Sequence, residues 1–167
     1  MRNIRTLFIL RHAKSSWDDA SLSDFDRPLN DRGVRDANIM AKELADKLSK
    51  LDLILSSSAN RAVSTAQIFA RTLNIPESKI KFNDSIYTAQ EDQVRSIVME
   101  LPDNHSQVMI VGHNPTLTYF ANRYYPEHIG NMPTAGIVKL EFDADSWSKV
   151  SKNKLASCFF DYPKNHK

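Results

Sequence analysis

The chain has 167 residues, 41% of them hydrophobic, and its 22 basic and 20 acidic side chains give a formal net charge of +2. This length fits one domain with one core. A charge so close to balance argues against a protein that binds nucleic acid or a membrane surface through a basic face. The single cysteine, Cys158, excludes an internal disulfide framework and a site of clustered thiolate metal ligands.

Glycine is scarce, and its positions exclude two common ways of binding phosphate. The sequence holds four glycines, at 33, 112, 130 and 136. A dinucleotide fingerprint needs three glycines within six residues, and a P-loop needs two glycines five apart followed by lysine. Neither spacing occurs, so any phosphate site must be built from side chains.

The sequence shows no targeting or membrane segment. No apolar run approaches the roughly 20 residues that a membrane span needs. The N-terminal residues lack the apolar stretch and cleavage site of a signal peptide. We therefore expect a cytoplasmic protein.

The hydrophobic pattern predicts alternating strands and helices from the N-terminus onward. The nearly continuous apolar run at 6–10 is typical of a strand covered on both faces. After a polar loop to Pro28, a helix is expected from Asn30. Its apolar stripe would consist of Val34, Ala37, Ala41, Leu44, Ala45 and Leu48.

The same alternation continues through the second half of the chain. A second buried strand is expected at 51–55, a helix at about 60–73, a weak strand at 80–82 and a helix at 93–101. A third strong strand at 107–111 precedes Asn114-Pro115, where Asn can cap a helix and Pro can take its first position. Two closing strands are expected at 137–142 and 155–160. The pattern indicates one α/β domain, a three-layer α/β/α sandwich with a mainly parallel sheet.

Cationic and imidazole side chains follow the three strongest predicted strands. Arg11 and His12 follow the first, Arg61 stands in the helix after the second, and His113 and Asn114 follow the third. Taken singly, each of these residues is more often structural than catalytic. Ligands of parallel sheets bind at the carboxyl ends of the strands, and two helix N-termini at that edge also favour an anion. The convergence predicts an anion pocket.

Such a pocket suits phosphoryl transfer, which depends on positioning and charge stabilisation. A histidine that neighbouring arginines keep neutral can attack phosphorus through one ring nitrogen. The other nitrogen then donates to a carbonyl or carboxylate that fixes the tautomer. Spacing alone does not choose between His12 and His113. No HxxH or HExxH spacing indicates a metal site.

Three segments resemble the motifs of the histidine phosphatase (phosphoglycerate-mutase-like) superfamily. Residues 10–15, LRHAKS, are similar to its Arg-His-Gly motif. Residues 56–66, SSSANRAVSTA, are similar to Ser-Ser-Pro-x-x-Arg-Ala-x-x-Thr-Ala, and residues 111–115, VGHNP, to the third motif. The order and spacing of the three motifs match those of the superfamily, and the match spans nearly the whole chain. The resemblance is strongest to the small SixA-type phosphohistidine phosphatases. Residues 26–29, 133–136 and 163–164 also resemble that branch.

The resemblance implies a role for each matching residue. His12 would be the nucleophile, Arg11 and Arg61 would clamp the phosphate oxygens, and His113 would stabilise the transferring group. We expect Ser15 and Asn114 to contact the phosphate as well. The resemblance further implies a phosphoglycerate mutase-like fold, with residues 1–167 forming a single histidine phosphatase domain, and no metal or organic cofactor.

Two positions depart from the family pattern. Ala13 stands where the family usually has glycine, which questions the tightness of the turn behind the nucleophile. Ser58 replaces proline, and a serine there can cap the helix that carries Arg61.

The proton donor has several candidates. Larger members of the family place an acid in an insertion between the second and third motifs, but residues 74–106 leave no room for such a lid. The candidates are Asp18, Asp24, Asp26 and Glu91, each of which is as a rule a solvated loop acid. Without a strong acid, a labile phosphoramidate is a more suitable substrate than a sugar phosphate. An open pocket would also admit a phosphorylated side chain of another protein.

Four functions remain open at this point. The first is a phosphatase of protein phosphohistidine, and the second is a phosphatase of small phosphomonoesters. The third is a phosphate-binding module that has lost catalysis, for which Ala13 is the best argument. The fourth is a mutase, although the short loops offer little for its second phosphate site.

Overall fold

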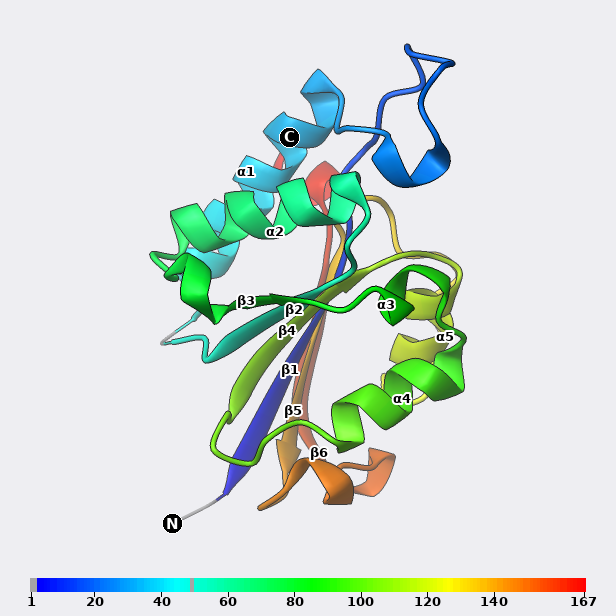
Figure 1. Cartoon of the computed structure of the whole chain (residues 1–167). Helices are drawn as coiled ribbons and strands as arrows, with labels where there is room; N and C mark the ends of the chain where they lie inside the picture. Colours follow the sequence, from blue (N-terminus) through cyan, green and yellow to red (C-terminus); the bar gives the residue numbers. More distant parts are fainter. Residues whose placement is uncertain (1–2, 49) are drawn as a thin grey trace.

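A computed structural model describes residues 3–48 and 50–167 and places one sheet between two layers of helices (Figure 1). The strands are β1 (Ile4–Arg11), β2 (Leu53–Ser56), β3 (Ile80–Phe82), β4 (Gln107–Gly112), β5 (Ile137–Asp143) and β6 (Leu155–Asp161). The helices are α1 (Asp31–Ala45), α2 (Asn60–Thr72), α3 (Ser85–Thr88), α4 (Glu91–Met99) and α5 (Thr116–Asn122). Short 3-10 turns lie at Asp24–Asp26, Glu77–Lys79, Trp147–Lys149, Lys152–Lys154 and Pro163–His166.

The strands of the described ranges form a six-stranded sheet in the order β3-β2-β4-β1-β5-β6. The pairs β3–β2, β2–β4 and β4–β1 are parallel, whereas β5 and β6 add antiparallel strands at one side. The prediction of a mainly parallel α/β sheet is therefore confirmed. Parallel neighbours need crossover connections, and the helices between these strands provide them.

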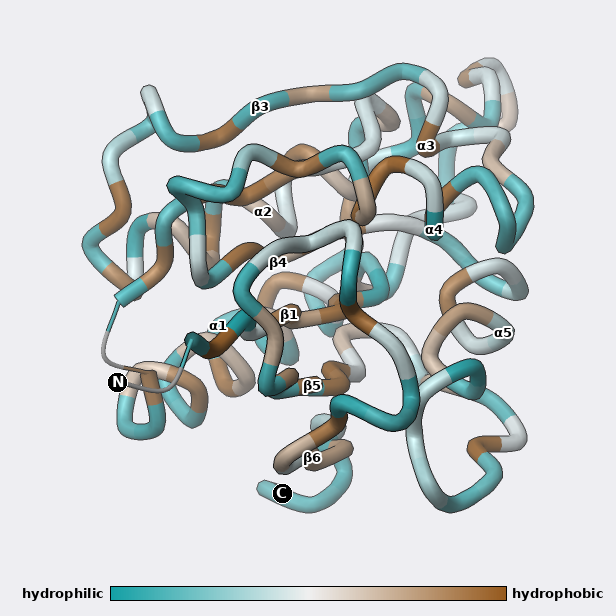
Figure 2. Tube along the Cα trace, turned by 90° about the horizontal axis from the view of Figure 1, so that it is seen from below, coloured by the Kyte–Doolittle hydropathy of each residue, from teal (hydrophilic) through white to brown (hydrophobic). Residues whose placement is uncertain are grey.

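Each central strand contributes to two hydrophobic clusters, one on each face of the sheet. Leu7 and Ile9 of β1 belong to one cluster, and Phe8 and Leu10 belong to the other. Successive side chains of a strand point to opposite faces, so a strand covered on both sides reads as a continuous apolar run. Figure 2 shows the hydrophobic stretches of β1 and β5 inside the molecule, with hydrophilic connections around them.

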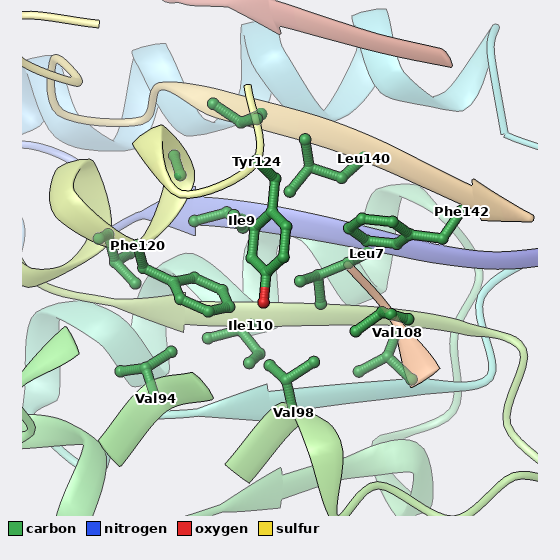
Figure 3. Close-up of a cluster of buried hydrophobic side chains, with 14 of the residues drawn as sticks. Leu7, Ile9, Val94, Val98, Val108, Ile110, Phe120, Tyr124, Leu140 and Phe142 are labelled. Atoms are coloured by element: carbon green, nitrogen blue, oxygen red, sulfur yellow. The ribbon is translucent and has the colours of Figure 1, made fainter. Parts of the chain in front are cut away.

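Helices from different parts of the chain cover the two faces (Figure 1). The first face is covered by α1 and α2, and the second by α4 and α5. On the second face, Val94 and Val98 of α4 and Phe120 of α5 pack with Tyr124 against the strands (Figure 3). The strand residues labelled in this close-up are Leu7, Ile9, Val108, Ile110, Leu140 and Phe142.

Helix α1 begins as predicted, but its buried face differs from the predicted stripe. The Asn30 side chain accepts a hydrogen bond of 2.8 Å from the Gly33 N–H and caps the helix. Val34 is 42% exposed and Ala45 is also exposed, so both predictions are wrong. In the first turn, Gly33 rather than Val34 faces the backbone of Lys14. Ala45 is exposed because it is the last residue of the helix.

The start of α5 also differs from the prediction. Helix α5 begins at Thr116, and Pro115 precedes it with a cis peptide bond to Asn114. Pro115 therefore does not occupy the first helical position. The Asn114 side chain still satisfies the helix end, because its Oδ1 accepts hydrogen bonds from the N–H and hydroxyl of Thr118. In residues 3–48 and 50–167, none of the helices has the length and apolar character that a membrane crossing needs.

Candidate active site

The carboxyl ends of β1, β4 and β2 lie side by side and at the same level. Arg11 is in register with Gly112, and Ser56 is in register with Val111. The His12 N–H donates to the Gly112 carbonyl over 3.1 Å, which extends the ladder by one residue. The predicted convergence of the three strand ends is therefore confirmed.

His12 lies just beyond β1 and is 7% exposed. Its Nδ1–H donates a hydrogen bond of 2.7 Å to the carbonyl of Ala13, which leaves the lone pair on Nε2. Burial lowers the pKa of His12 to about 3 against the opposing effect of that carbonyl, and His113, Arg61 and Arg11 lower it further. The arginines were expected to keep the imidazole neutral, but burial has the larger effect.

His113 faces His12 across the site. Their ring centroids are 5.2 Å apart. The Nε2 atom of His113 lies 2.8 Å from the Ser57 hydroxyl, which also accepts the Ala59 N–H. When Ser57 donates to Nε2, the proton of the neutral ring stays on Nδ1, which is a free donor. Burial, followed by the positive charge of Arg61, lowers the pKa of His113 to about 4.

Both arginines are fixed by carbonyl groups and keep donors free. Arg11 donates from Nη1 to the Met132 carbonyl over 2.8 Å. Arg61 donates from Nη1 to the Asp24 carbonyl over 2.6 Å and from Nη2 to the Asp24 carboxylate over 2.9 Å. Among the described residues, six buried side-chain atoms have no hydrogen-bond partner, and three of them belong to Arg5 and Asp36. The other three lie at this edge, namely the Nε atoms of Arg11 and Arg61 and the Nδ1 atom of His113.

These three unpaired atoms identify the kind of ligand that fits the site. A buried donor without a partner costs free energy of about 1–3 kcal/mol, and more for a charged group. Three such nitrogens at one sheet edge are satisfied together by an anion with several oxygens. Within the ranges that the structure describes, no group of three or more His, Cys, Asp or Glu side chains could hold a metal ion.

Ala13 fits its position without strain. Asn74 and Ala135 are the described non-glycine residues with positive φ, so the turn at Ala13 does not need the left-handed conformation that favours glycine. The Ala13 side chain is fully buried in the cluster under α1 and α2. Its N–H donates to the Thr65 hydroxyl over 3.0 Å, and this contact connects the turn after His12 to α2.

Ser58 does not cap α2, so that prediction is wrong. The N-terminal flanking residue is Ala59, which makes no side-chain cap. Ser57, one residue earlier than expected, accepts the Ala59 N–H over 3.2 Å. The Ser58 hydroxyl instead donates to the carboxylate of Asp84, which draws it away from the helix end.

Ser15 contacts Arg27, and Asn114 contacts the same carbonyl as Arg11. The Ser15 hydroxyl is buried and accepts a hydrogen bond of 2.7 Å from Arg27. Asn114 donates to the Met132 carbonyl over 3.0 Å, and the same carbonyl accepts from Arg11. A direct contact of either residue with phosphate stays a prediction.

The candidate acids occupy different places. Asp24 reaches the site through Arg61, and a hydrogen bond from Tyr87, followed by those from Arg61 and Arg27, holds the pKa of Asp24 far below its usual range. Glu91 begins α4 and pairs with Arg123, which lowers the pKa of Glu91. Both are therefore ionised at neutral pH in the free protein, and a role of either as proton donor stays a prediction.

The two remaining candidates are exposed. Asp26 accepts a hydrogen bond from Ser23 in the 3-10 turn. Asp18 lies in the preceding part of the same loop, where its N–H donates to the Ser16 hydroxyl. Whether either acts as proton donor stays a prediction.

Tyr87 is part of the site, although the sequence did not point to it. It lies on the short helix α3, and its ring packs edge-on against His113 with centroids 5.4 Å apart. Its hydroxyl donates to Asp24 over 2.5 Å. The available signal was the run Asn83-Asp84-Ser85, which is typical of a helix start, and Asn83 does accept from the Ser85 N–H.

The comparisons with known proteins agree with this geometry. Residues 7–84 match the sequence profile of the histidine phosphatase superfamily, branch 1. The chain is 31% identical over 166 residues to the uncharacterized protein MT1313 of Mycobacterium tuberculosis, covering 93% of this chain and 100% of that protein.

Solved structures give the same result. A protein of Agrobacterium tumefaciens described as a 'putative phosphohistidine phosphatase SixA' has 33% identity and a TM-score of 0.76, and the match covers 83% of this chain and 92% of that one. The structure of a protein histidine phosphatase SixA complexed with tungstate has 23% identity and a TM-score of 0.77. The match covers 97% of this chain and 99% of that chain, and it shows the same fold. With its motif residues gathered at one sheet edge, the chain belongs to the SixA-type branch of the histidine phosphatase superfamily.

Proposed function

We propose that this protein hydrolyses phosphohistidine on another protein, and that His12 carries the phosphoryl group between the two half-reactions. The observation that carries the proposal is the Nδ1–H bond from His12 to the Ala13 carbonyl, which leaves the lone pair of Nε2 for attack. The unpaired nitrogens of Arg11, Arg61 and His113 support it, because they can bind the oxygens of a phosphoryl group.

The reaction proceeds in two displacements. The Nε2 lone pair of His12 attacks phosphorus, the bond from phosphorus to the substrate nitrogen breaks, and its electron pair leaves with that nitrogen. Water then attacks phosphorus on His12 and releases inorganic phosphate, which restores the imidazole. The two arginines stabilise the charge on the equatorial oxygens in both steps.

Two features of related proteins support the choice of substrate. The relative from Agrobacterium tumefaciens is described as a phosphohistidine phosphatase. Tungstate, which is present in another SixA structure, is a tetrahedral oxyanion like phosphate. A phosphoramidate also needs less help from an acid than a sugar phosphate does, which fits a site where the carboxylate that contacts Arg61, Asp24, is ionised.

The test is to trap the phosphoenzyme. The wild-type protein is mixed with a peptide carrying labelled phosphohistidine, quenched in alkali, digested and mapped. We expect the label on His12, and we expect the His12→Ala variant to lose both the label and turnover. His128→Ala removes an exposed histidine in a loop and serves as the matched control, with activity retained.

Substrate choice is measured by kcat/KM on the peptide and on a sugar phosphate and a nucleoside monophosphate. The proposal predicts a clear preference for the peptide. Full activity of His12→Ala would contradict the assigned nucleophile, and a preference for a small ester would contradict the assigned substrate.

A further inference from the structure

A carboxylate stands beside the phosphate-binding groups with one side open to solvent. The Oδ2 atom of Asp24 accepts hydrogen bonds from Arg61 and from the Tyr87 hydroxyl, at 2.9 and 2.5 Å. The Oδ1 atom accepts from Nη2 and Nε of Arg27, at 3.0 and 3.3 Å. The Asp24 side chain is nevertheless 50% exposed, whereas that of Arg61 is 7% exposed. The carboxylate is thus fixed in place and still accessible to a ligand.

The charge of this carboxylate is constant at neutral pH. The hydrogen bond from Tyr87, and then those from Arg61 and Arg27, keep the pKa of Asp24 far below its usual range. An ionised carboxylate accepts hydrogen bonds and attracts cations, but it cannot donate a proton. Asp24 therefore does not have the properties of a general acid, although it borders the site.

Aromatic rings lie beside the carboxylate. The Tyr87 ring packs edge-on against Phe25, with centroids 5.0 Å apart, and edge-on against His113. Phe25 follows Asp24 in the chain and is 37% exposed. The exposed carboxylate, which pairs with Arg27 and Arg61, therefore lies next to two aromatic side chains.

The leaving group of the reaction must extend away from His12. In an in-line displacement the leaving group departs opposite the nucleophile, and His12 is only 7% exposed, whereas the Asp24 side chain is 50% exposed. A phosphorylated imidazole that carries a proton on its second nitrogen is flat, aromatic and cationic. It can donate that N–H to a carboxylate and pack against aromatic rings.

We propose that Asp24, together with Phe25 and Tyr87, forms a leaving-group subsite that binds the protonated imidazole of phosphohistidine. This inference rests on the proposed function and deepens it. Asp24 accepts a hydrogen bond from the ring nitrogen that does not carry phosphorus, and so it favours the protonated form of the substrate.

The atoms and charges of the step balance without a proton donor. Nε2 of His12 bonds to phosphorus while the bond from phosphorus to the substrate nitrogen breaks. The electron pair of that bond goes to the departing nitrogen and neutralises the positive ring. Because the other nitrogen already carries its proton, neutral imidazole leaves. The role of the carboxylate is to hold that N–H, not to supply a proton.

A competing explanation is that Asp24 only positions Arg61. The two roles predict different patterns of substrate dependence. A positioning residue acts on the phosphoryl group, so its loss slows every phosphate substrate to the same extent. A leaving-group residue acts on the departing ring, so its loss slows the substrate with a cationic leaving group and spares one with an anionic leaving group.

The experiment compares the Asp24→Asn variant with wild type on two substrates. One is a phosphohistidine peptide, and the other is p-nitrophenyl phosphate, which leaves as an anion and needs no proton. A hydrogen bond to a charged group contributes about 1.5–3 kcal/mol, which corresponds to a factor of about 10 to 100 in kcat/KM. Both substrates lose the contact that fixes Arg61, and we expect kcat/KM for the peptide to fall by about that factor more than kcat/KM for the ester.

Two controls separate charge from structure. Asp24→Glu keeps the charge and is expected to retain the preference for the peptide. Asp19→Asn removes a carboxylate from the same loop whose contacts are with Ser21, and it is expected to behave like wild type. Should Asp24→Asn fail to fold, Asp24→Ser tests the same loss of charge with a smaller hydrogen-bonding side chain.

The ratio of the two kcat/KM values decides the outcome. A fall of more than threefold in the ratio of peptide to ester supports the subsite. A smaller change, whether both activities decline together or neither declines, overturns it. A wild-type enzyme that prefers the ester contradicts the proposed function itself, whereas a wild-type preference for the peptide with an unchanged ratio in the variant contradicts the subsite alone.

Discussion

His12 is a buried side chain and the proposed nucleophile, and its burial and its proposed role depend on the same contacts. Burial keeps the imidazole neutral, and the carbonyl of Ala13 holds the remaining proton on Nδ1. The lone pair of Nε2 is then available in nearly all molecules at neutral pH. Arg11 and Arg61 lower the pKa of His12 as well, but burial has the larger effect.

The turn behind this histidine tolerates alanine, and this leads to a prediction. Ala13→Gly introduces the usual residue of the family, but Ala13 has no left-handed backbone that glycine would relieve. The variant loses a buried methyl group and gains freedom in the unfolded chain, so we expect its free energy of unfolding to fall by about 1–2 kcal/mol. We expect kcat/KM to stay within about threefold of wild type.

Urea denaturation and phosphatase assays of the same preparations check this prediction. A tenfold gain in kcat/KM with unchanged stability would contradict it. That result would mean that the methyl group of Ala13 distorts the turn.

At the scale of single elements, the position of α1 depends on one close contact between the backbone at Gly33 and the backbone of Lys14. A Cβ atom on Gly33 would lie 2.1 Å from the carbonyl oxygen of Lys14, two residues after the nucleophile. We expect Gly33→Ala to displace the first turn of α1 or the Lys14 backbone, lower the free energy of unfolding by about 1–3 kcal/mol and reduce kcat/KM.

Gly130→Ala is the matched control, because a Cβ atom there would meet nothing within 4 Å. Its stability is expected to stay within about 0.5 kcal/mol of wild type. Equal stability of the two variants in urea denaturation would disprove the role assigned to the α1 contact.

The long elements could be predicted from the sequence because their burial leaves a periodic pattern. Strand β1 is covered on both faces, so its apolar run is continuous, and α2 buries Ala62, Thr65, Ala66 and Phe69 as its period predicts. Helix α3 and the 3-10 turn Asp24–Asp26 are too short to show a period. Tertiary contacts stabilise them, and those contacts are not visible in a local pattern.

The same distinction applies to the site. The strand ends and the three motifs predicted His12, Arg11, Arg61 and His113, because parallel strands must bring their carboxyl ends together. The contact of Asp24 with Tyr87 joins residues 63 positions apart, and its contact with Arg61 spans 37 positions. No sequence spacing encodes such pairs, so the open side of the site became clear from the structure alone.

On the scale of the whole molecule, the fold places two imidazoles, whose pKa values are lowered by burial, and the unpaired Nε atoms of Arg11 and Arg61 at one sheet edge. Apolar clusters on both faces of the sheet stabilise the fold. A buried site that disfavours protonation must make the stability of the molecule depend on pH. This dependence can be measured separately from activity.

The sign of this dependence follows from the two histidines. In the unfolded chain an imidazole binds its proton with a pKa near 6.5. In the folded protein the pKa is about 3 for His12 and about 4 for His113. Between the folded and unfolded pKa values the unfolded state binds more protons than the folded state. The free energy of unfolding is therefore highest above about pH 6.5 and decreases as the pH falls toward 4.

Urea denaturation at pH 7.5 and pH 5.0 gives the free energies of unfolding of wild type and His12→Gln. At pH 5.0 the unfolded imidazole of His12 is charged and the folded one is not, which costs the wild type about 2 kcal/mol. Glutamine does not titrate, so the variant should lose about 2 kcal/mol less than wild type over this interval. Above pH 7.5 the two proteins should show the same slope. Parallel pH dependence down to pH 5.0 would mean that the folded protein can protonate His12, and the assignment of a permanently neutral nucleophile would then fail.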